Sequence, residues 1–406
     1  MSAPATLTTL LPIRDRRDRV VGYAVSSCPA QEGSGGSPDD DARVALEGVA
    51  RIVRLAGKSI IMPIGPSLVR DGSITRFAST DAVWLLSTSA LDDPPTRRAV
   101  DRLLGQGFHF ALDGFPDGEP LLPALMGSTI VLDATRTPMA LLETRTRVLI
   151  DAGLRPLIRG VDDRSLRQRA LGAGATLHTG RLLVRGGSTR VDRGAEESVI
   201  RALTMLGAFA DGRPPDGSFD AYIQEDPNMG AAIVRAMSSA ALGIRGPRSV
   251  THAMTVLGRD AVMEQLVTVA ARLIGDAAGD PELAFVALRR ARVCERVGAA
   301  LDPAPHPRAR AVAGLLSMLE FSLGVPSCAI AERIDLPPVV RDTLERRSTP
   351  LGRLLDAIDA IDYGWWDDLR SRCSELGIAP HVLSAANTEA WRDARDELGF
   401  SRSEQS

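Results

Sequence analysis

Residues 219–258 read FDAYIQEDPNMGAAIVRAMSSAALGIRGPRSVTHAMTVLG, and this stretch decides the fold of the C-terminal half. Asp226 followed by Pro227 predicts a helix start, because the carboxylate can accept a free backbone N–H and proline there forfeits no hydrogen bond. Gly243 stands where a left-handed cap ends that helix. A Gly-Pro turn then leads to a second helix, which Ser249 can cap. The stretch therefore predicts two short helices packed as a hairpin.

The order and spacing of these signals resemble the HDOD domain, an all-helical relative of the HD phosphohydrolases that lacks their metal-binding histidines and aspartates. The matching residues are Asp226, Pro227, Ser238, Ser239, Ala240, Arg245, Leu257 and Gly258. Each short motif alone is common at the start or end of helices, so the resemblance depends on the order and spacing of all these residues together. None of the five histidines is followed by aspartate. The paired His-Asp ligands of an active HD site are therefore absent, and we expect no metal hydrolysis by this half.

Composition and charge narrow the class of protein. A chain of 406 residues with 44% hydrophobic and 24% charged residues predicts an ordinary globular protein of two or three domains. A net charge of −3 gives no electrostatic reason to expect binding to nucleic acid or to an anionic membrane. The four cysteines form no CxxC pair, and no apolar run is long enough to span a bilayer. We therefore expect a cytoplasmic protein.

The N-terminal half alternates short apolar runs with amphipathic helical patterns. The runs that predict strands are Val20–Val25, Ser59–Ile64, Ala82–Leu86, Phe108–Leu112, Thr129–Leu132, Pro156–Ile158 and Leu182–Val184. The patterns that predict helices between them are Ala42–Ala56, Thr96–Gly105 and Pro138–Ala152. Strand and helix units that alternate in this way favour a (β/α) barrel.

Four segments of this half resemble the EAL domain, a TIM-like barrel that hydrolyses cyclic di-GMP with two divalent cations. They are LPIRDRRDRVVGYAV at 11–25, ALDGFPDGEP at 111–120, IVLDATR at 130–136 and the stretch 153–186 that begins GLRPLIRG. The resemblance implies that carboxylates at the carboxyl ends of the strands would hold the cations.

Most ligand positions implied by this resemblance carry other residues. Ala24 stands where the family has its signature glutamate, and Val131 replaces the strand lysine. Arg159 replaces a late glutamate, and its positive charge would repel a cation. The paired aspartates are reduced to Asp113 followed by Gly114. Because one carboxylate cannot hold two metal ions, the sequence predicts no metal, no cofactor and no catalytic residue.

Three residues of the expected barrel mouth have competing interpretations. Asp113 is either a vestigial ligand or a structural partner of Arg159, and the second is favoured. Arg159 and Arg181 could bind an anionic ligand at the mouth. The favoured interpretation is that they form structural ion pairs in a site that has lost its metal ligands. Leu11 and Arg181 also replace polar groups with which the EAL family grips its nucleotide.

The chain beyond the hairpin stays helical in pattern. The predicted helices are Asp260–Ile274, Glu282–Leu301, Arg310–Leu323, Cys328–Ile334, Pro338–Arg346, Pro350–Ile361, Trp365–Leu376 and Pro380–Leu398, after a connecting helix at Ala195–Ala208. The pair Trp365–Trp366 suits either the core or an exposed partner-binding patch, and the core is favoured.

Because the chain resembles an EAL barrel in its first half and an HDOD domain in its second, it is similar to proteins that fuse these two domains. We predict a degenerate EAL-type (β/α) barrel at 1–187, a linker helix and loop at 188–217, and an all-α HDOD domain with a C-terminal helical extension at 218–406. The hypothesis is a catalytically inactive signal-transduction protein. Its HDOD helices would contact a regulatory protein partner, and its barrel would be a scaffold or dimerisation module. Two alternatives stay open: a receptor for cyclic di-GMP or another anionic nucleotide without hydrolysis, and a weak residual cyclic di-GMP phosphodiesterase.

Overall fold

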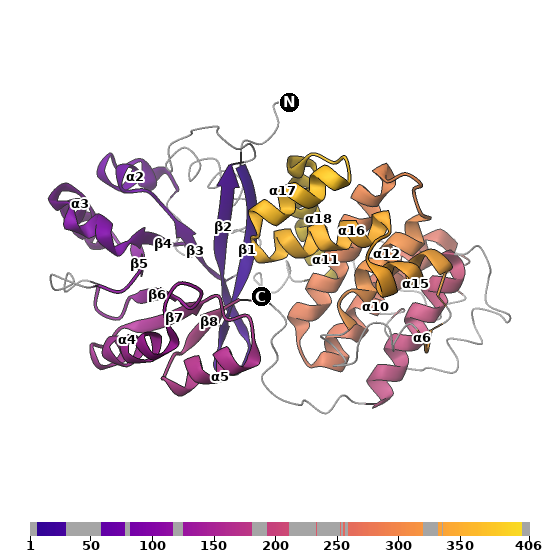
Figure 1. Ribbon diagram of the computed structural model, residues 1–406, viewed down its shortest axis with the longest axis horizontal. Coiled ribbons are helices and arrows are strands. Elements are labelled where there is room, and N and C mark those ends of the chain that lie inside the picture. Colours follow the sequence, from indigo (N-terminus) through magenta and orange to yellow (C-terminus); the bar gives the residue numbers. More distant parts are fainter. Residues whose placement is uncertain are drawn as a thin grey trace. The chain divides into compact units, whose positions relative to one another are not determined.

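The computed structural model describes the following residues: 6–29, 58–77, 82–116, 125–180, 193–210, 233, 252, 255, 259–319, 332–334 and 336–399. The chain divides into two compact units. The colours in Figure 1 follow the sequence from the N-terminus to the C-terminus. The first unit contains residues 1–188 together with Ala360–Trp366. The second contains the rest of the chain.

The first unit is built on a closed barrel whose strands follow one another in chain order. The strands are β1 (Thr6–Asp15), β2 (Val20–Pro29), β3 (Ser59–Pro63), β4 (Ala82–Ser87), β5 (His109–Asp113), β6 (Thr129–Asp133), β7 (Arg155–Arg159) and β8 (Leu177–Thr179). Strand β1 is antiparallel to both of its neighbours, β2 and β8, and the remaining pairs are parallel. The predicted N-terminal barrel followed by a helical region is confirmed.

Helices connect the parallel strands on the outside of the barrel (Figure 1). They are α2 (Pro66–Arg70), α3 (Pro94–Gly105), α4 (Met139–Asp151) and α5 (Arg164–Gly172), with 3₁₀ turns at Ser73–Phe77 and Thr88–Asp92. The side chains of Asp93 and Asp163 accept backbone N–H groups in the first turns of α3 and α5, which fixes where each helix begins. The helix expected at Ala42–Ala56 and the strand expected at Leu182–Val184 lie outside the described residues.

The described elements of the second unit are helices. They are α6 (Arg193–Ala210), α10 (Arg259–Ala278), α11 (Pro281–Val297), a 3₁₀ turn at Gly298–Ala300, α12 (Pro307–Leu316), α15 (Pro338–Arg346), α16 (Pro350–Tyr363), α17 (Trp366–Glu375) and α18 (Pro380–Leu398). The bounds of α15 and α18 are those that the sequence predicts, and α16 extends to Tyr363 rather than ending at Ile361. Residues 360–363 at its end belong to the first unit.

Helix α11 forms the centre of the helical unit. It begins at Pro281, with the Asp280 carboxylate accepting the N–H of Glu282, and most of its side chains are buried. Phe285 packs edge-on against Trp391 of α18, with ring centroids 4.3 Å apart. Helices α10, α12 and α18 contact α11, and α6, which lies in the predicted connector, contacts α10 and α12. The unit thus has a core of its own.

Two groups of sequence predictions fall outside the part of the chain that the structure describes. The HDOD motif residues Asp226, Pro227, Ser238, Ser239, Ala240, Arg245, Leu257 and Gly258 lie there, and so does Arg181. Among the described helices, none is both long enough and apolar enough to cross a membrane.

Candidate functional site

The inside of the barrel is a layer of apolar side chains. Its buried members are Ile13, Ile61, Leu85, Ala111, Val131 and Leu157, with Ala24, Val83 and Leu177 packed against them. Ala24 and Val131, which occupy expected ligand positions, are therefore part of this apolar layer. Successive residues of a strand point to opposite sides, so the next residue to face the interior comes two positions later. That residue is charged on three neighbouring strands.

Asp113, Asp133 and Arg159 are these residues, and each is the last residue of its strand, on β5, β6 and β7. The carboxyl ends of barrel strands form the face where barrel enzymes place their active sites. Asp133 and Arg159 are direct register partners in the parallel pair β6–β7. The strand alternation thus brings two carboxylates and one guanidinium to the same end of the barrel.

The Arg159 guanidinium lies between the two carboxylates. Its Nη1 and Nη2 atoms donate to the two oxygens of Asp113, both at 3.3 Å. Its Nε and Nη2 atoms donate to Asp133 Oδ2 at 3.2 and 3.0 Å. The ion pair between Asp113 and Arg159 that the sequence suggests is present, but Arg159 is shared with a second carboxylate.

Asp133 is held more firmly than Asp113. Its Oδ1 atom accepts hydrogen bonds from the backbone N–H and the hydroxyl of Thr135, at 2.9 and 2.6 Å. Burial raises the pKa of Asp133, but the hydrogen bonds from Thr135 and the charge of Arg159 outweigh it and hold the pKa below its ordinary value. Asp133 is therefore an ionised, oriented carboxylate at neutral pH.

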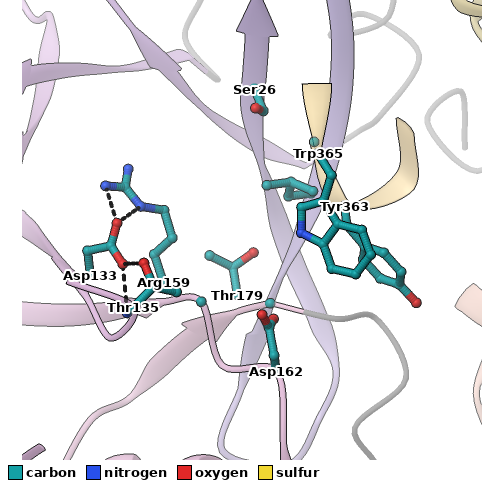
Figure 2. A pocket seen from close by; sticks show the side chains of 12 residues that line it. Ser26, Asp133, Thr135, Arg159, Asp162, Thr179, Tyr363 and Trp365 are labelled. Carbon is teal, nitrogen blue, oxygen red and sulfur yellow. Dashed lines mark hydrogen bonds and ion pairs between the residues drawn. The ribbon is translucent and has the colours of Figure 1, made fainter. Parts of the chain in front are cut away.

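A cavity of about 360 Å³ opens beside this cluster. The residues that line it are Leu11, Ser26, Asp133, Thr135, Arg159, Gly160, Asp162, Thr179, Gly180, Tyr363, Gly364 and Trp365. All of them belong to the first compact unit. Figure 2 shows Asp133, Thr135 and Arg159 on one side of the cavity and the rings of Tyr363 and Trp365 on the other. The size is within the range of small-molecule sites.

Two glycines that line the cavity, Gly160 directly after β7 and Gly180 directly after β8, let the backbone lie close to neighbouring atoms. A Cβ atom on Gly180 would lie 2.2 Å from the carbonyl oxygen of Val161. Gly160 has a φ of +77°, and a Cβ atom there would lie 2.6 Å from Thr135 Cγ2. Larger residues would push these strand ends apart, so the glycines help to set the shape of the mouth.

The arrangement does not fit a divalent cation between Asp113 and Asp133. A cation there would need the oxygens that Arg159 now occupies, and it would face the positive charge of the guanidinium. Within the described ranges, no group of three or more His, Cys, Asp or Glu side chains is placed to hold a metal ion.

Sequence reasoning missed Asp133, Thr135, Asp162 and the aromatic pair. The signal for Asp133 was available, because HFALD, TIVLD and RPLIR are strands of one length that end in Asp113, Asp133 and Arg159. Trp365, for which the core was favoured, has an exposed fraction of 36% and lines the cavity. That preference was wrong.

No protein-family model matches the chain. A curated relative from Vibrio cholerae, named cyclic di-GMP phosphodiesterase CdgJ, is 23% identical over 334 residues, which are 81% of this chain and 77% of the relative. The match is longer than the barrel unit and therefore extends into the helical half.

Several solved structures are also similar in the barrel region. Klebsiella pneumoniae BlrP1 in a calcium and cyclic di-GMP complex is 18% identical, with a TM-score of 0.36 over 45% of this chain and 55% of that chain. This chain thus spans about half the length of that protein. The EAL domain of Mycobacterium smegmatis DcpA is 19% identical, with a TM-score of 0.35 over 45% of this chain and 92% of that domain. Similarity at this level supports no statement about function.

The Vibrio cholerae relative contradicts the expectations that this chain is catalytically inactive, a pseudoenzyme and not an enzyme, since that relative is named as a phosphodiesterase. Those expectations came from a comparison of single positions with the ligands of the EAL family, in which only one ligand position, Asp113, still carried a carboxylate. The structure brings a second carboxylate, Asp133, to the same end of the barrel as Asp113, with a cationic group between them. The replacement of the expected metal ligands was therefore not enough to infer that the barrel is catalytically inactive.

Proposed function

We propose that this protein is a cyclic di-GMP phosphodiesterase whose nucleotide site is the cavity at the carboxyl ends of the barrel strands. The similarity to the Vibrio cholerae phosphodiesterase across both halves of the chain carries this proposal. The barrel mouth supports it with a cationic group, two carboxylates and a cavity of ligand size.

Arg159 is the group that would bind a phosphate of the ligand. Its contacts with Asp113 are the longer ones, at 3.3 Å, and both side chains are about one-third exposed. Ion pairs with that exposure contribute about 0.2–1 kcal/mol, so exchanging Asp113 for a phosphate oxygen costs little. The planar guanidinium can keep Asp133 on one edge while it donates to phosphate on the other.

The exchange would leave Asp113 beside the bound phosphodiester as a free carboxylate. Hydrolysis forms a bond from a water oxygen to phosphorus and breaks one P–O ester bond, which opens the ring to a linear dinucleotide. Asp113 would take the proton from the water, Arg159 would stabilise the charge on the phosphate oxygens, and the departing sugar oxygen would take a proton from solvent. Asp133 would hold Arg159 in place.

Turnover of cyclic di-GMP, followed by chromatography of the linear product with chelator and with added Mg²⁺ or Mn²⁺, tests the proposal. We expect Asp113→Asn to lose most turnover and to bind the nucleotide as tightly as wild type or more tightly, because the competing carboxylate is neutralised. Arg159→Ala should weaken binding at least about tenfold, the loss expected for a hydrogen bond to a charged group. The matched control is Arg169→Ala, whose pair with Glu143 is outside the cavity.

No product from wild-type protein under any of these metal conditions would overturn the phosphodiesterase. Equal turnover in Asp113→Asn and wild type would remove Asp113 from the reaction and leave the barrel mouth without its proposed base.

We further infer that residues 218–406 form an HDOD domain that contacts a regulatory protein partner. The sequence motifs from Asp226 to Gly258 support this, as does the extension of the Vibrio cholerae match into the helical half. Affinity purification with crosslinking from the native host, compared between wild type and an Arg245→Glu variant, is the test. A strictly monomeric protein without a crosslinked partner would contradict it.

A further inference from the structure

An aromatic pair lies across the cavity from the phosphate-binding side. The rings of Tyr363 and Trp365 contact each other with centroids 4.8 Å apart and planes inclined by 43°. Both residues line the cavity, and Trp365 is 36% exposed. Figure 2 shows the pair facing the cavity from the side opposite Asp133 and Arg159.

The backbone around this pair is fixed by the end of helix α16. Gly364 has a φ of +68° and turns the chain out of the helix. The N–H of Trp365 donates to the carbonyl of Ala360 at 2.8 Å. A Cβ atom on Gly364 would lie 2.9 Å from Ser26 Oγ on strand β2, so the turn packs closely against the barrel. Trp365 is thus presented by a short, defined turn.

We propose that Trp365, supported by Tyr363, stacks on the purine base of a nucleotide whose phosphate is bound by Arg159. The inference rests on the proposed function and names the residues that bind the base. A nucleotide has an anionic end and a flat apolar face, and this cavity has a guanidinium on one side and aromatic rings on the other. Base stacking on an aromatic side chain does not require a particular base.

The volume of the cavity limits the size of the ligand that it can enclose. About 360 Å³ is at the small end of ligand sites, which span roughly 300–1,000 Å³. We therefore expect one nucleotide half of a cyclic dinucleotide inside the cavity, with its base on Trp365, and the other half nearer to solvent. A purine mononucleotide should then use the same contacts.

An exposed tryptophan can also mark a protein-binding surface, but two observations favour the nucleotide. The aromatic rings line a cavity together with convergent polar groups, namely Thr135, Arg159 and Thr179. The other large apolar side chains that are exposed in the described residues are Val21, Met126, Leu141, Val148, Ile150 and Val382, and none of them lines this cavity. The aromatic pair is therefore part of a concave site.

Calorimetric titration of the full chain with cyclic di-GMP and, separately, with 5′-GMP tests the inference. Trp365→Ala should weaken binding of both probes roughly 5- to 100-fold, the range for one base–aromatic stack, and Trp365→Phe should recover most of the affinity. Wild-type tryptophan fluorescence should be quenched by either probe, and Trp365→Phe should remove most of the quenching. Trp366→Ala, next in the chain but outside the cavity, is the matched control.

The outcomes separate this inference from the proposed function. If wild type binds cyclic di-GMP and Trp365→Ala binds it equally well, the stacking role is overturned and the proposed function stands. If 5′-GMP binds through Trp365 but cyclic di-GMP does not bind, the stacking role stands and the proposed function is overturned. If neither probe binds to wild type, both are overturned.

Discussion

At the level of single residues, the sequence allowed the pair of Asp113 and Arg159 to be anticipated but not its setting. The resemblance pointed to both positions because they replace ligands of a known family. The resemblance did not point to Asp133, although the strands HFALD, TIVLD and RPLIR all end in a charged residue. Its role follows from strand register, which places it beside Arg159. Register depends on backbone pairing across the barrel, and a single strand's sequence does not contain it.

Replacing Arg159 by glutamate should create a cation site. The variant would have three carboxylates at the ends of adjacent strands, with no positive charge between them, and divalent cations prefer such oxygen ligands. We expect Arg159→Glu to bind Mn²⁺ in a calorimetric titration. Without metal, its melting temperature should be lower than that of wild type because like charges repel, and Mn²⁺ should restore it.

Arg169→Glu introduces the same charge change outside the mouth and is the control for general electrostatic effects. An Arg159→Glu protein whose melting temperature does not respond to Mn²⁺ would show that the three carboxylates cannot converge on one ion.

Asp18 stabilises the opposite end of the barrel, in the turn between β1 and β2. Its carboxylate pairs with Arg167 at 2.6 Å and lies 3.5 Å from His178. Burial raises the pKa of Asp18, but the interactions with His178 and Arg167 outweigh it and hold the pKa below its ordinary value. A depressed carboxyl pKa stabilises the fold above the unfolded value of about 3.9, and this contribution is lost as the pH falls through the folded value.

Asp18→Asn should therefore lower the free energy of unfolding by about 1–3 kcal/mol at pH 7, because Arg167 is left buried without its charged partner. Asparagine tolerates the left-handed backbone, with a φ of 61° at this position. The difference from wild type in urea denaturation should shrink below pH 4. Asp15→Asn, whose partner Arg19 is exposed, should cost less than about 1 kcal/mol. A difference for Asp18→Asn that does not change with pH would rule out the electrostatic origin.

At the level of elements, local signals were sufficient where a helix carries its own start and stop. Helices α15 and α18 begin at Pro338 and Pro380, and α18 ends at Gly399 in the left-handed conformation. Strand β8 shows the opposite case. Its three residues, Leu177–Thr179, form no apolar run, and they are a strand because β1 and β7 pair with them. Pairing from both sides decides such an element, so the sequence prediction did not include it.

The contact between helices α11 and α12 depends on Gly314. A Cβ atom there would lie 2.6 Å from the Cα atom of Ala291, which is backbone and cannot rotate away. Gly314→Ala should therefore separate the helices and lower the free energy of unfolding by about 1–3 kcal/mol. Gly172→Ala on α5 meets nothing within 4 Å and should be neutral or stabilise by up to about 1 kcal/mol. Thermal denaturation of both variants measures the contrast, and equal melting temperatures would contradict it.

At the level of the whole molecule, the two sequence patterns predicted a barrel part and a helical part, and each compact unit does have its own apolar core. The sequence placed Tyr363 and Trp365 in the helical part, because they follow a helical pattern. Contacts assign residues 360–366 to the barrel unit. Such an assignment depends on contacts between residues more than 300 positions apart, such as Ser26 and Gly364, and no local pattern encodes them.

This division predicts how nucleotide binding changes the dynamics of the chain. A ligand stabilises the conformation that it binds, by about 2.7 kcal/mol at 100 times its Kd, and it slows only those openings that break its site. Hydrogen exchange with saturating cyclic di-GMP should therefore slow at the carboxyl ends of β5, β6 and β7 and at residues 360–366. Helices α10, α11 and α12, which belong to the other core, should exchange at their original rates. Slower exchange throughout those helices would mean that the two units open together, and the barrel could then signal its occupancy directly to the helical unit.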